Sequence, residues 1–261
     1  MEISLTGKRA LITGGSRGLG RAMAEAFAEA GADVAVVARE ESVLQETVAA
    51  LQNIRPLGKF VGISADVSEA SNVSRAHGEA VEFFGPIDVL VNNAGTSNAQ
   101  PFLQVDDQSW LDDFNLKFFS AVRLCRLCIP DMQRQGWGRI INTLNSAAKA
   151  PTANSCPTSV ARAAGMAMTK ALASEFAADG ILVNALNTGL LVSHQWVTRW
   201  EAQAGDQTFD QFINEMGRRI PIGRMGDPRE FANLALFLAS DAASYVTGAA
   251  INIDGGLTPV V

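Results

Sequence analysis

A glycine-rich segment near the start of the chain has the composition of a phosphate-binding turn. Residues 13–20 read TGGSRGLG, after an apolar run and before a helical pattern. Glycines let the backbone turn sharply and approach a pyrophosphate closely. The N-terminus of the following helix would present free N–H groups and a positive dipole to the phosphates. This context predicts a dinucleotide site formed by Gly14, Ser16, Arg17, Gly18, Leu19 and Gly20.

The end of the second expected strand indicates which dinucleotide would bind. About 20 residues beyond such a turn, an acidic side chain hydrogen-bonds the ribose 2′-hydroxyl of NAD. Here Ala38 and Arg39 stand at this place, and Arg17 lies in the turn itself. Two guanidinium groups suit a 2′-phosphate, because arginine forms strong charge-assisted pairs with phosphate. We therefore expect NADP(H) in preference to NAD(H), although Glu40 and Glu41 weaken the positive potential.

With this turn, five further motifs resemble the short-chain dehydrogenase/reductase family over nearly the whole chain. They are Asp66-Val67, Asn92-Asn93-Ala94-Gly95, Val183-Asn184 with Gly189, Val246-Thr247-Gly248 and Asp254-Gly255-Gly256. The resemblance implies a seven-stranded Rossmann-type fold, a nicotinamide dinucleotide cofactor and a homodimer or homotetramer. It also implies cofactor contacts from Asp66, Val67, Asn93, Ala94, Gly95, Arg162, Gly189 and Ser193.

The same resemblance places a catalytic tetrad of Asn, Ser, Tyr and Lys on this chain, and three of its four positions are substituted. Asn115 fits the first member. A following Ala-Ala-Gly and Thr-Lys fix the register of the helix, so Thr158 stands at the tyrosine position and Arg162 at the lysine position. The serine position falls on Asn145, with Ser146 beside it. The chain's one tyrosine lies near the C-terminus, so no shift of register restores the phenol.

These substitutions change the proton chemistry of the site. A phenol with a pKa near 10, lowered by a neighbouring ammonium, can exchange a proton with a carbonyl oxygen. The hydroxyl of Thr158 is a far weaker acid, and Arg162 stays charged and can only hold ribose hydroxyls or an anion. Arginine at this position resembles the halohydrin dehalogenases, a non-redox branch that retains the tyrosine but lacks the glycine-rich turn. His194 and Lys149 are the remaining candidates for a proton donor.

Three functions remain open. The first is an atypical NADP(H)-dependent oxidoreductase acting on a small carbonyl or alcohol substrate, with Asn145, Ser146, Thr158 or His194 orienting the carbonyl. The second is a non-redox enzyme that holds an anionic substrate against Arg162. The third is a cofactor-binding protein without turnover.

Seven short apolar runs alternate with helical patterns and predict the scaffold that positions these residues. Strands are expected at 9–13, 33–38, 60–64, 87–92, 139–144, 181–186 and 249–253, and helices near 18–30, 41–52, 69–83, 107–134, 157–178 and 227–240. The strands are continuous apolar runs, which indicates burial on both faces of a parallel sheet. Right-handed crossovers then give a doubly wound α/β fold in a single domain spanning residues 1–261.

One segment, at about 190–224, is too long for an ordinary connection. Its apolar residues at 196 and 200, and at 209, 212, 213 and 216, fit two short amphipathic helices. We interpret the segment as a lid over the substrate.

Composition excludes several classes of protein. The 261 residues are 48% hydrophobic and 18% charged, as in a globular protein. A net charge of −6 argues against nucleic acid or an anionic membrane surface as partner. No apolar run approaches the ~18 residues of a membrane span.

The start lacks the features of a signal peptide, and three cysteines suggest a reducing, cytoplasmic location. With two histidines in the chain, we expect Cys125 and Cys128 to pack in the core and expect no metal site.

Overall fold

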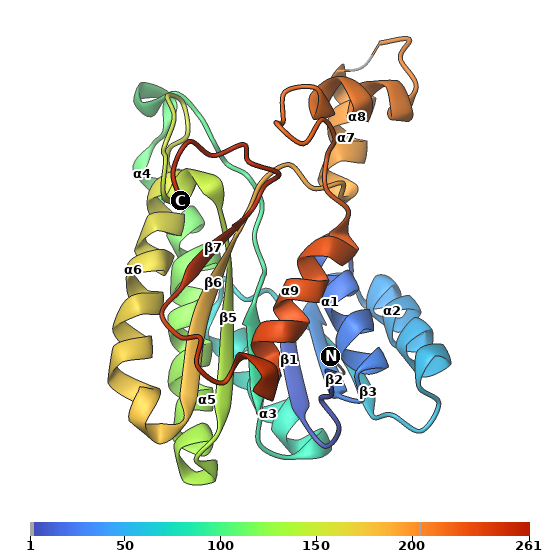
Figure 1. Cartoon of the computed structure of the whole chain (residues 1–261), viewed down its shortest axis with the longest axis vertical. Helices are drawn as coiled ribbons and strands as arrows, with labels where there is room; N and C mark the ends of the chain where they lie inside the picture. Colours follow the sequence, from blue (N-terminus) through green and yellow to red (C-terminus); the bar gives the residue numbers. More distant parts are fainter. Residues whose placement is uncertain (1–2, 204) are drawn as a thin grey trace.

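Seven parallel strands form one sheet in the order β3-β2-β1-β4-β5-β6-β7. The computed structural model describes residues 3–203 and 205–261 (Figure 1). The strands are β1 (Arg9–Thr13), β2 (Asp33–Ala38), β3 (Phe60–Ser64), β4 (Val89–Asn92), β5 (Gly138–Asn145), β6 (Ile181–Thr188) and β7 (Ala250–Ile253). The strand order reverses between β1 and β4: the chain adds β2 and β3 on one side of β1 and then crosses to β4 on the other side. In such folds, ligands bind beyond the carboxyl ends of the strands at this point.

Helices cover both faces of the sheet, which confirms the doubly wound fold (Figure 1). Phe27 and Phe231 are fully buried in the core on one face, and Val73 and Leu124 lie in the core on the other. The first face is covered by α1 (Gly18–Glu29), α2 (Glu41–Ile54) and α9 (Pro228–Ala239), and the second by α3 (Ala70–Phe84), α5 (Ser120–Gln135) and α6 (Thr158–Phe176).

The observed elements differ from the sequence prediction mainly at their ends. Strand β5 extends one residue beyond each expected end, and β6 continues two residues further than expected, because Asn145 pairs with Thr188 and Thr188 pairs with Ile253. The longer strands carry the backbone to the edge of the sheet where Asn145 and the segment after Thr188 were expected to act. Strand β4 is shorter than expected and begins at Val89.

A π-helical turn interrupts the helix that the sequence predicts as continuous over 107–134. Helix α4 (Asp107–Phe114) is capped at its N-terminus by Asp106, whose carboxylate accepts the Ser109 N–H at 2.8 Å. The π turn η2 (Asn115–Phe119) follows it, and α5 then begins. A π turn closes i→i+5 hydrogen bonds and shifts which side chains share a face of the helix.

The expected lid consists of two short helices, as its apolar spacing predicts. Helices α7 (His194–Gln203) and α8 (Phe209–Gly217) stand above the sheet, at the top right of Figure 1. They have a small apolar cluster of their own, in which the rings of Trp196 and Phe212 lie 6.3 Å apart. The hydroxyl of Thr208 accepts the Gln211 N–H and completes a capping box at the start of α8. Within the described residues, no helix has the length and apolar character needed to cross a membrane.

Candidate active site

The turn between β1 and α1 has a backbone that only glycine fits. Gly14 and Gly18 have φ angles of +62° and +53°, a region that side chains disfavour. A Cβ added to Gly20 would collide with the Gly14 carbonyl oxygen, and one added to Gly15 would lie 2.8 Å from Cγ1 of Val36. The turn opens into α1, whose first N–H groups can receive a phosphate. An open cavity of about 450 Å³ adjoins it, lined by Ser16, Arg17, Gly18, Arg21, Val43 and Glu46.

The segment after β4 is hydrogen-bonded to this turn. The Thr13 hydroxyl accepts the N–H groups of Asn93 and Ala94 at 2.9 and 3.0 Å. The Asn93 amide nitrogen donates to the carbonyls of Thr13 and Gly14 at 3.1 and 3.2 Å. The structure thus brings Asn93, Ala94 and Gly95 together with the glycine-rich turn. The Asn93 side chain is used to hold the turn in shape.

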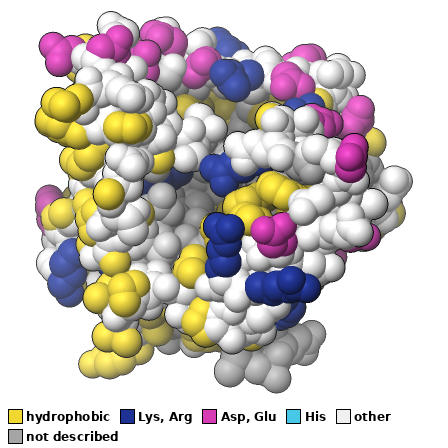
Figure 2. All heavy atoms as spheres, turned by 90° about the horizontal axis from the view of Figure 1, so that it is seen from above, with side chains coloured by type: hydrophobic (Ala, Val, Ile, Leu, Met, Phe, Trp, Pro, Cys, Tyr) yellow, Lys and Arg dark blue, Asp and Glu magenta, His cyan; other side chains and the backbone are white. Residues whose placement is uncertain are grey.

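Charged residues gather where a 2′-phosphate is expected. Nη2 of Arg17 lies 2.8 Å from Oε2 of Glu40, and both side chains are exposed. The carbonyl of Arg39 accepts the Ser64 hydroxyl at 3.0 Å. Partial burial raises the pKa of Asp66, but hydrogen bonds from Ser68 and the charge of Arg39 act against it and lower the pKa overall. Seen from above, the molecule is hollowed, and Lys and Arg side chains lie around the hollow (Figure 2).

A buried group of three charged side chains, Asp113, Lys117 and Arg162, includes one direct contact to Thr158 at the first turn of α6. Nζ of Lys117 donates to Oγ1 of Thr158 at 3.0 Å and also pairs with the Asp113 carboxylate. Nη1 of Arg162 donates to the Thr143 carbonyl at 2.5 Å. Lys117, Thr158 and Arg162 are only 5%, 5% and 9% exposed. Ion pairs and hydrogen bonds are what make such burial of charge tolerable.

Burial shifts the pKa values of both cations in this cluster. It lowers the pKa of Lys117 to about 8, although the hydrogen bond and charge of Asp113 act in the opposite direction and Arg162 adds to the lowering. Burial likewise lowers the pKa of Arg162 to about 10, against the charge of Asp113. Both side chains are therefore mainly protonated at neutral pH, and Lys117 is near its titration range. A group that titrates near the working pH is suited to proton transfer.

Lys117 is the residue that the sequence analysis missed. Asn115, the expected tetrad member, instead has its Oδ1 held by Nη2 of Arg123 at 3.1 Å, and Arg123 also donates to the Ser68 carbonyl. Within the π turn η2, Lys117 points to Thr158, while Asn115 faces Arg123. A signal was present in the sequence, because a lysine four residues after an aspartate in a helix can pair with it.

The other expected catalytic residues lie at the end of β5, in the turn after it and at the start of α7. Asn145 ends β5, and its Oδ1 is buried without a hydrogen-bond partner in the described part of the chain. Ser146 begins the short 3-10 helix η3 (Ser146–Ala148), and Lys149 follows it, half-buried. His194 begins α7, but its side chain lies outside the described residues.

The base of the lid lies against the cofactor turn. The Cβ of Ser193 is 3.4 Å from where a Cβ of Gly18 would stand. Gly189 donates its N–H to the Ile253 carbonyl at 2.9 Å, and a Cβ there would lie 2.5 Å from the Cα of Asp254. Gly189 and Ser193 are therefore placed at the edge of the sheet where the sequence analysis expects cofactor contacts.

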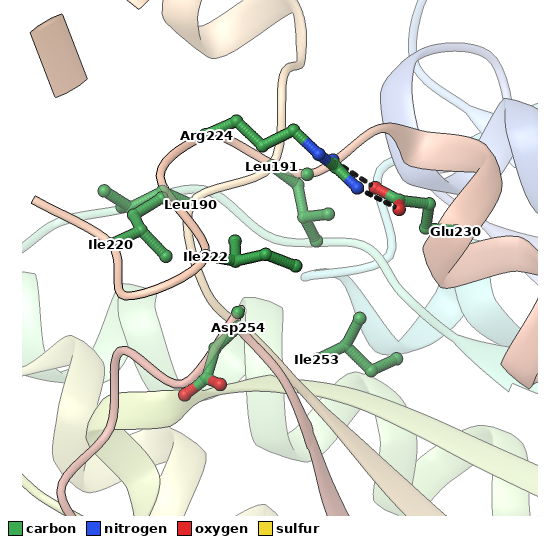
Figure 3. A pocket seen from close by; sticks show the side chains of 10 residues that line it. Leu190, Leu191, Ile220, Ile222, Arg224, Glu230, Ile253 and Asp254 are labelled. Atoms are coloured by element: carbon green, nitrogen blue, oxygen red, sulfur yellow. Dashed lines mark hydrogen bonds and ion pairs between the residues drawn. The ribbon is translucent and has the colours of Figure 1, made fainter. Parts of the chain in front are cut away.

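A small apolar cavity of about 110 Å³ lies beside the lid base (Figure 3). Leu190, Ile220 and Ile222 line it, and Arg224 closes one side through a bidentate pair with Glu230 at 2.6 and 2.8 Å. None of the residues around Thr158 lines this cavity. It is therefore separate from the cluster that holds the ionisable groups.

Cys125 and Cys128 are buried in the core between the sheet and α5, as expected. Burial raises the pKa of Cys125 to about 12, so its thiol is unreactive. Across residues 3–203 and 205–261, no three His, Cys, Asp or Glu side chains are placed to hold a metal ion.

Comparison with known proteins agrees with this geometry. The model of a family described as enoyl-(acyl carrier protein) reductase matches residues 14–258. A 3-oxoacyl-(acyl carrier protein) reductase from Chlamydia pneumoniae is 34% identical over 259 residues, which cover 99% of this chain and 100% of that protein. The short-chain reductase NovJ from Streptomyces niveus is 36% identical over 249 residues, covering 95% and 92% of the two chains.

Two solved structures are similar over the whole fold. L-sorbose reductase from Gluconobacter frateurii, complexed with NADPH and L-sorbose, superimposes with a TM-score of 0.96 at 32% identity and covers 100% of both chains. An NADPH-bound short-chain oxidoreductase with an atypical catalytic center, from Pseudomonas aeruginosa PAO1, gives a TM-score of 0.92 at 34% identity over 99% of this chain and 100% of that one. Sequence motifs, strand order and both kinds of comparison agree: the chain belongs to the short-chain dehydrogenase/reductase family of oxidoreductases.

Proposed function

We propose that the protein is an NADP(H)-dependent oxidoreductase that interconverts a small carbonyl compound and its alcohol, with Lys117 and Thr158 replacing the usual phenol. The observation that carries this proposal is the 3.0 Å hydrogen bond from buried Nζ of Lys117 to Oγ1 of Thr158. It couples a weakly acidic hydroxyl to an ammonium group whose pKa is lowered to about 8.

The residues present fit a nicotinamide dinucleotide phosphate. An open cavity adjoins the glycine-rich turn and could take a pyrophosphate, and Arg17 and Arg39 supply positive charge where a 2′-phosphate would lie. A Cβ on Gly95 would collide with Nη2 of Arg162, so this guanidinium lies against the segment expected to touch the cofactor. We assign Arg162 to holding the ribose hydroxyls. The NADPH found in both similar structures supports the choice of cofactor. When bound, NADPH would supply the hydride for reduction.

The chain itself would supply the proton. As negative charge develops on the substrate oxygen, the Thr158 hydroxyl gives up its proton to that oxygen and takes one from Nζ of Lys117. Lys117 is left neutral and regains a proton from solvent. The N-terminus of the 19-residue helix α6 carries a positive dipole that stabilises negative charge on Oγ1 of Thr158 during the transfer. Oxidation of an alcohol follows the same path in reverse.

Substitution of Lys117 tests the proposal. General acid catalysis contributes about 10²–10⁴-fold, so Lys117→Met should lower kcat for NADPH-dependent carbonyl reduction by about that factor. NADPH affinity should stay within about twofold, because we place no cofactor contact on Lys117. The matched control is Lys170→Met, at an exposed position on α6. Wild-type kcat in Lys117→Met, measured over a carbonyl panel, would contradict the proposal.

The charge of the cluster favours one alternative function. Lys117 and Arg162 are two buried cations with a single carboxylate, Asp113, between them, and Nε of Arg162 lacks a partner in the described part of the chain. A site with excess positive charge could hold an anionic substrate for a non-redox reaction. Substrate conversion without oxidation of NADPH or reduction of NADP would favour this alternative. Cofactor binding without any turnover would favour the third function, a binding protein.

A further inference from the structure

The loop after β4 crosses the start of α6, where two hydrogen bonds hold it, and a third hydrogen bond lies within the loop. The backbone N–H of Asn98 donates to Oγ1 of Thr158 at 2.9 Å. The N–H of Gln100 donates to the Cys156 carbonyl at 2.8 Å. The side-chain amide of Gln100 then donates to Oδ1 of Asn98 at 2.7 Å. The loop thus reaches the proposed proton donor through one backbone N–H.

The contacts of the Thr158 hydroxyl determine where its hydrogen can point. A hydroxyl has one hydrogen and two acceptor lone pairs. Both lone pairs are used here, by the Asn98 N–H at 2.9 Å and by Nζ of Lys117 at 3.0 Å. Among the side chains and backbone groups that the structure describes, none accepts a hydrogen bond from this hydroxyl. Its hydrogen is therefore directed to a third partner, which in the proposed reaction is the substrate oxygen.

Gln100 is the side chain that keeps the Asn98 N–H in place. Thr96, Ser97 and Ala99 are exposed, whereas Asn98 and Gln100 are half-buried. An exposed backbone has few contacts to fix its direction, so the Gln100 amide is a main constraint on Asn98. Without it, the Asn98 N–H can turn to water. Oγ1 of Thr158 would then lose one of the two donors that stabilise it as it gives up its proton, an effect like the loss of an oxyanion-hole donor.

We propose that Gln100 is a positioning residue, which orients the Thr158 hydroxyl by holding the Asn98 backbone N–H on Oγ1. This inference rests on the proposed role of Thr158 as proton donor. It assigns to the loop a part in proton transfer besides lining the site.

Amide hydrogen exchange at Asn98 tests the positioning without any need for turnover. A backbone N–H held by Thr158 should exchange slowly for a loop residue. Gln100→Met, which keeps the length but removes the amide, should speed exchange at Asn98 by about tenfold, as loss of one hydrogen bond implies. Thr158→Val should do the same. Gln104→Met, an exposed glutamine of the same connection, is the control and should leave exchange at Asn98 unchanged.

Kinetics test whether this positioning matters for the reaction. Gln100→Met should lower kcat by about tenfold with KM and NADPH affinity within twofold of wild type. It should also raise the apparent pKa of the kcat profile, because Oγ1 of Thr158 becomes a better acceptor for the Lys117 ammonium. A purely structural role would lower the melting temperature without moving that pKa. Asn98→Ala removes the acceptor of the hydrogen bond that the Gln100 amide donates. It should therefore lower kcat as much as Gln100→Met does, and the double variant should show no further loss of kcat.

The outcomes separate this inference from the proposed function. Slow exchange at Asn98 and an unchanged pH profile in Gln100→Met would overturn the positioning role, even if Lys117→Met is inactive. If Lys117→Met and Thr158→Val retain full activity, Thr158 is not the proton donor and the proposed function fails first.

Discussion

At the scale of single residues, Lys117 gives the reaction a defined pH dependence. Its pKa lies near 8 because burial disfavours the ammonium form. Reduction needs the proton on Lys117, so kcat for reduction should fall as the pH rises above about 8. Oxidation of the alcohol needs neutral Lys117 and should rise over the same range. Rate profiles of wild type and Lys117→Met in both directions check this, since the titration should vanish in the variant; a transition that persists there would belong to another group.

The pair of Arg17 and Glu40 makes a second prediction at this scale. Oε2 of Glu40 lies 2.8 Å from Nη2 of Arg17 and would compete with the proposed 2′-phosphate for the guanidinium. Exposed ion pairs contribute about 0–1 kcal/mol, so Glu40→Gln should tighten NADPH binding by up to about fivefold and leave NADH binding nearly unchanged.

Arg39→Ala should weaken NADPH binding by about 1.5–3 kcal/mol, as for loss of a charged hydrogen bond. Fluorescence titration with both cofactors measures this, and equal affinities in wild type would refute the NADP(H) preference.

At the scale of elements, the sequence predicts the scaffold well and the catalytic cluster in part. Strands such as β1 and β2 are continuous apolar runs. Such runs must be buried on both faces, which predicts a place in the interior of a parallel sheet covered by helices. The two lid helices follow from apolar spacing in the same way. The resemblance of the sequence motifs to the family predicts that Thr158 and Arg162 lie in one site. Lys117 was not predicted, because a regular helix through 107–134 gives no sign of the π turn that directs it to Thr158.

The lid provides the prediction at this scale. Helices α7 and α8 pack on each other through their own apolar cluster, in which Trp196 and Phe212 are buried. Such a unit can move as one body about its two connections to the domain. Limited proteolysis within 194–218 should therefore occur without ligand and be slowed by cofactor with substrate, with cofactor alone as the control. Hydrogen exchange in this segment as slow as in the core strands of the free protein would refute a mobile lid.

At the scale of the whole molecule, the outer surface of α4, η2 and α6 leaves apolar side chains exposed. Leu111, Phe119 and Val160 are 57%, 42% and 42% exposed, on elements that contact one another, and exposed apolar side chains that form a patch often mark an interface. We therefore expect a homodimer or homotetramer that buries this surface. Light scattering after size-exclusion chromatography measures the mass, and Phe119→Asp should shift it towards that of a monomer. A monomer at micromolar wild-type concentration would refute the expectation.

The π turn also has a consequence for recognising other proteins with this chemistry. Three positions at fixed spacing, Asp113, Asn115 and Lys117, lie at or next to this turn, and of these Lys117 pairs with Asp113 and donates to Thr158, which begins α6 four residues before Arg162. Written as a pattern, this is D-x-N-x-K followed by T-x-x-x-R. Chains on this fold that carry both halves should contain the same buried ammonium beside a threonine. Chains with the second half alone would keep the hydroxyl but lack the group that returns its proton.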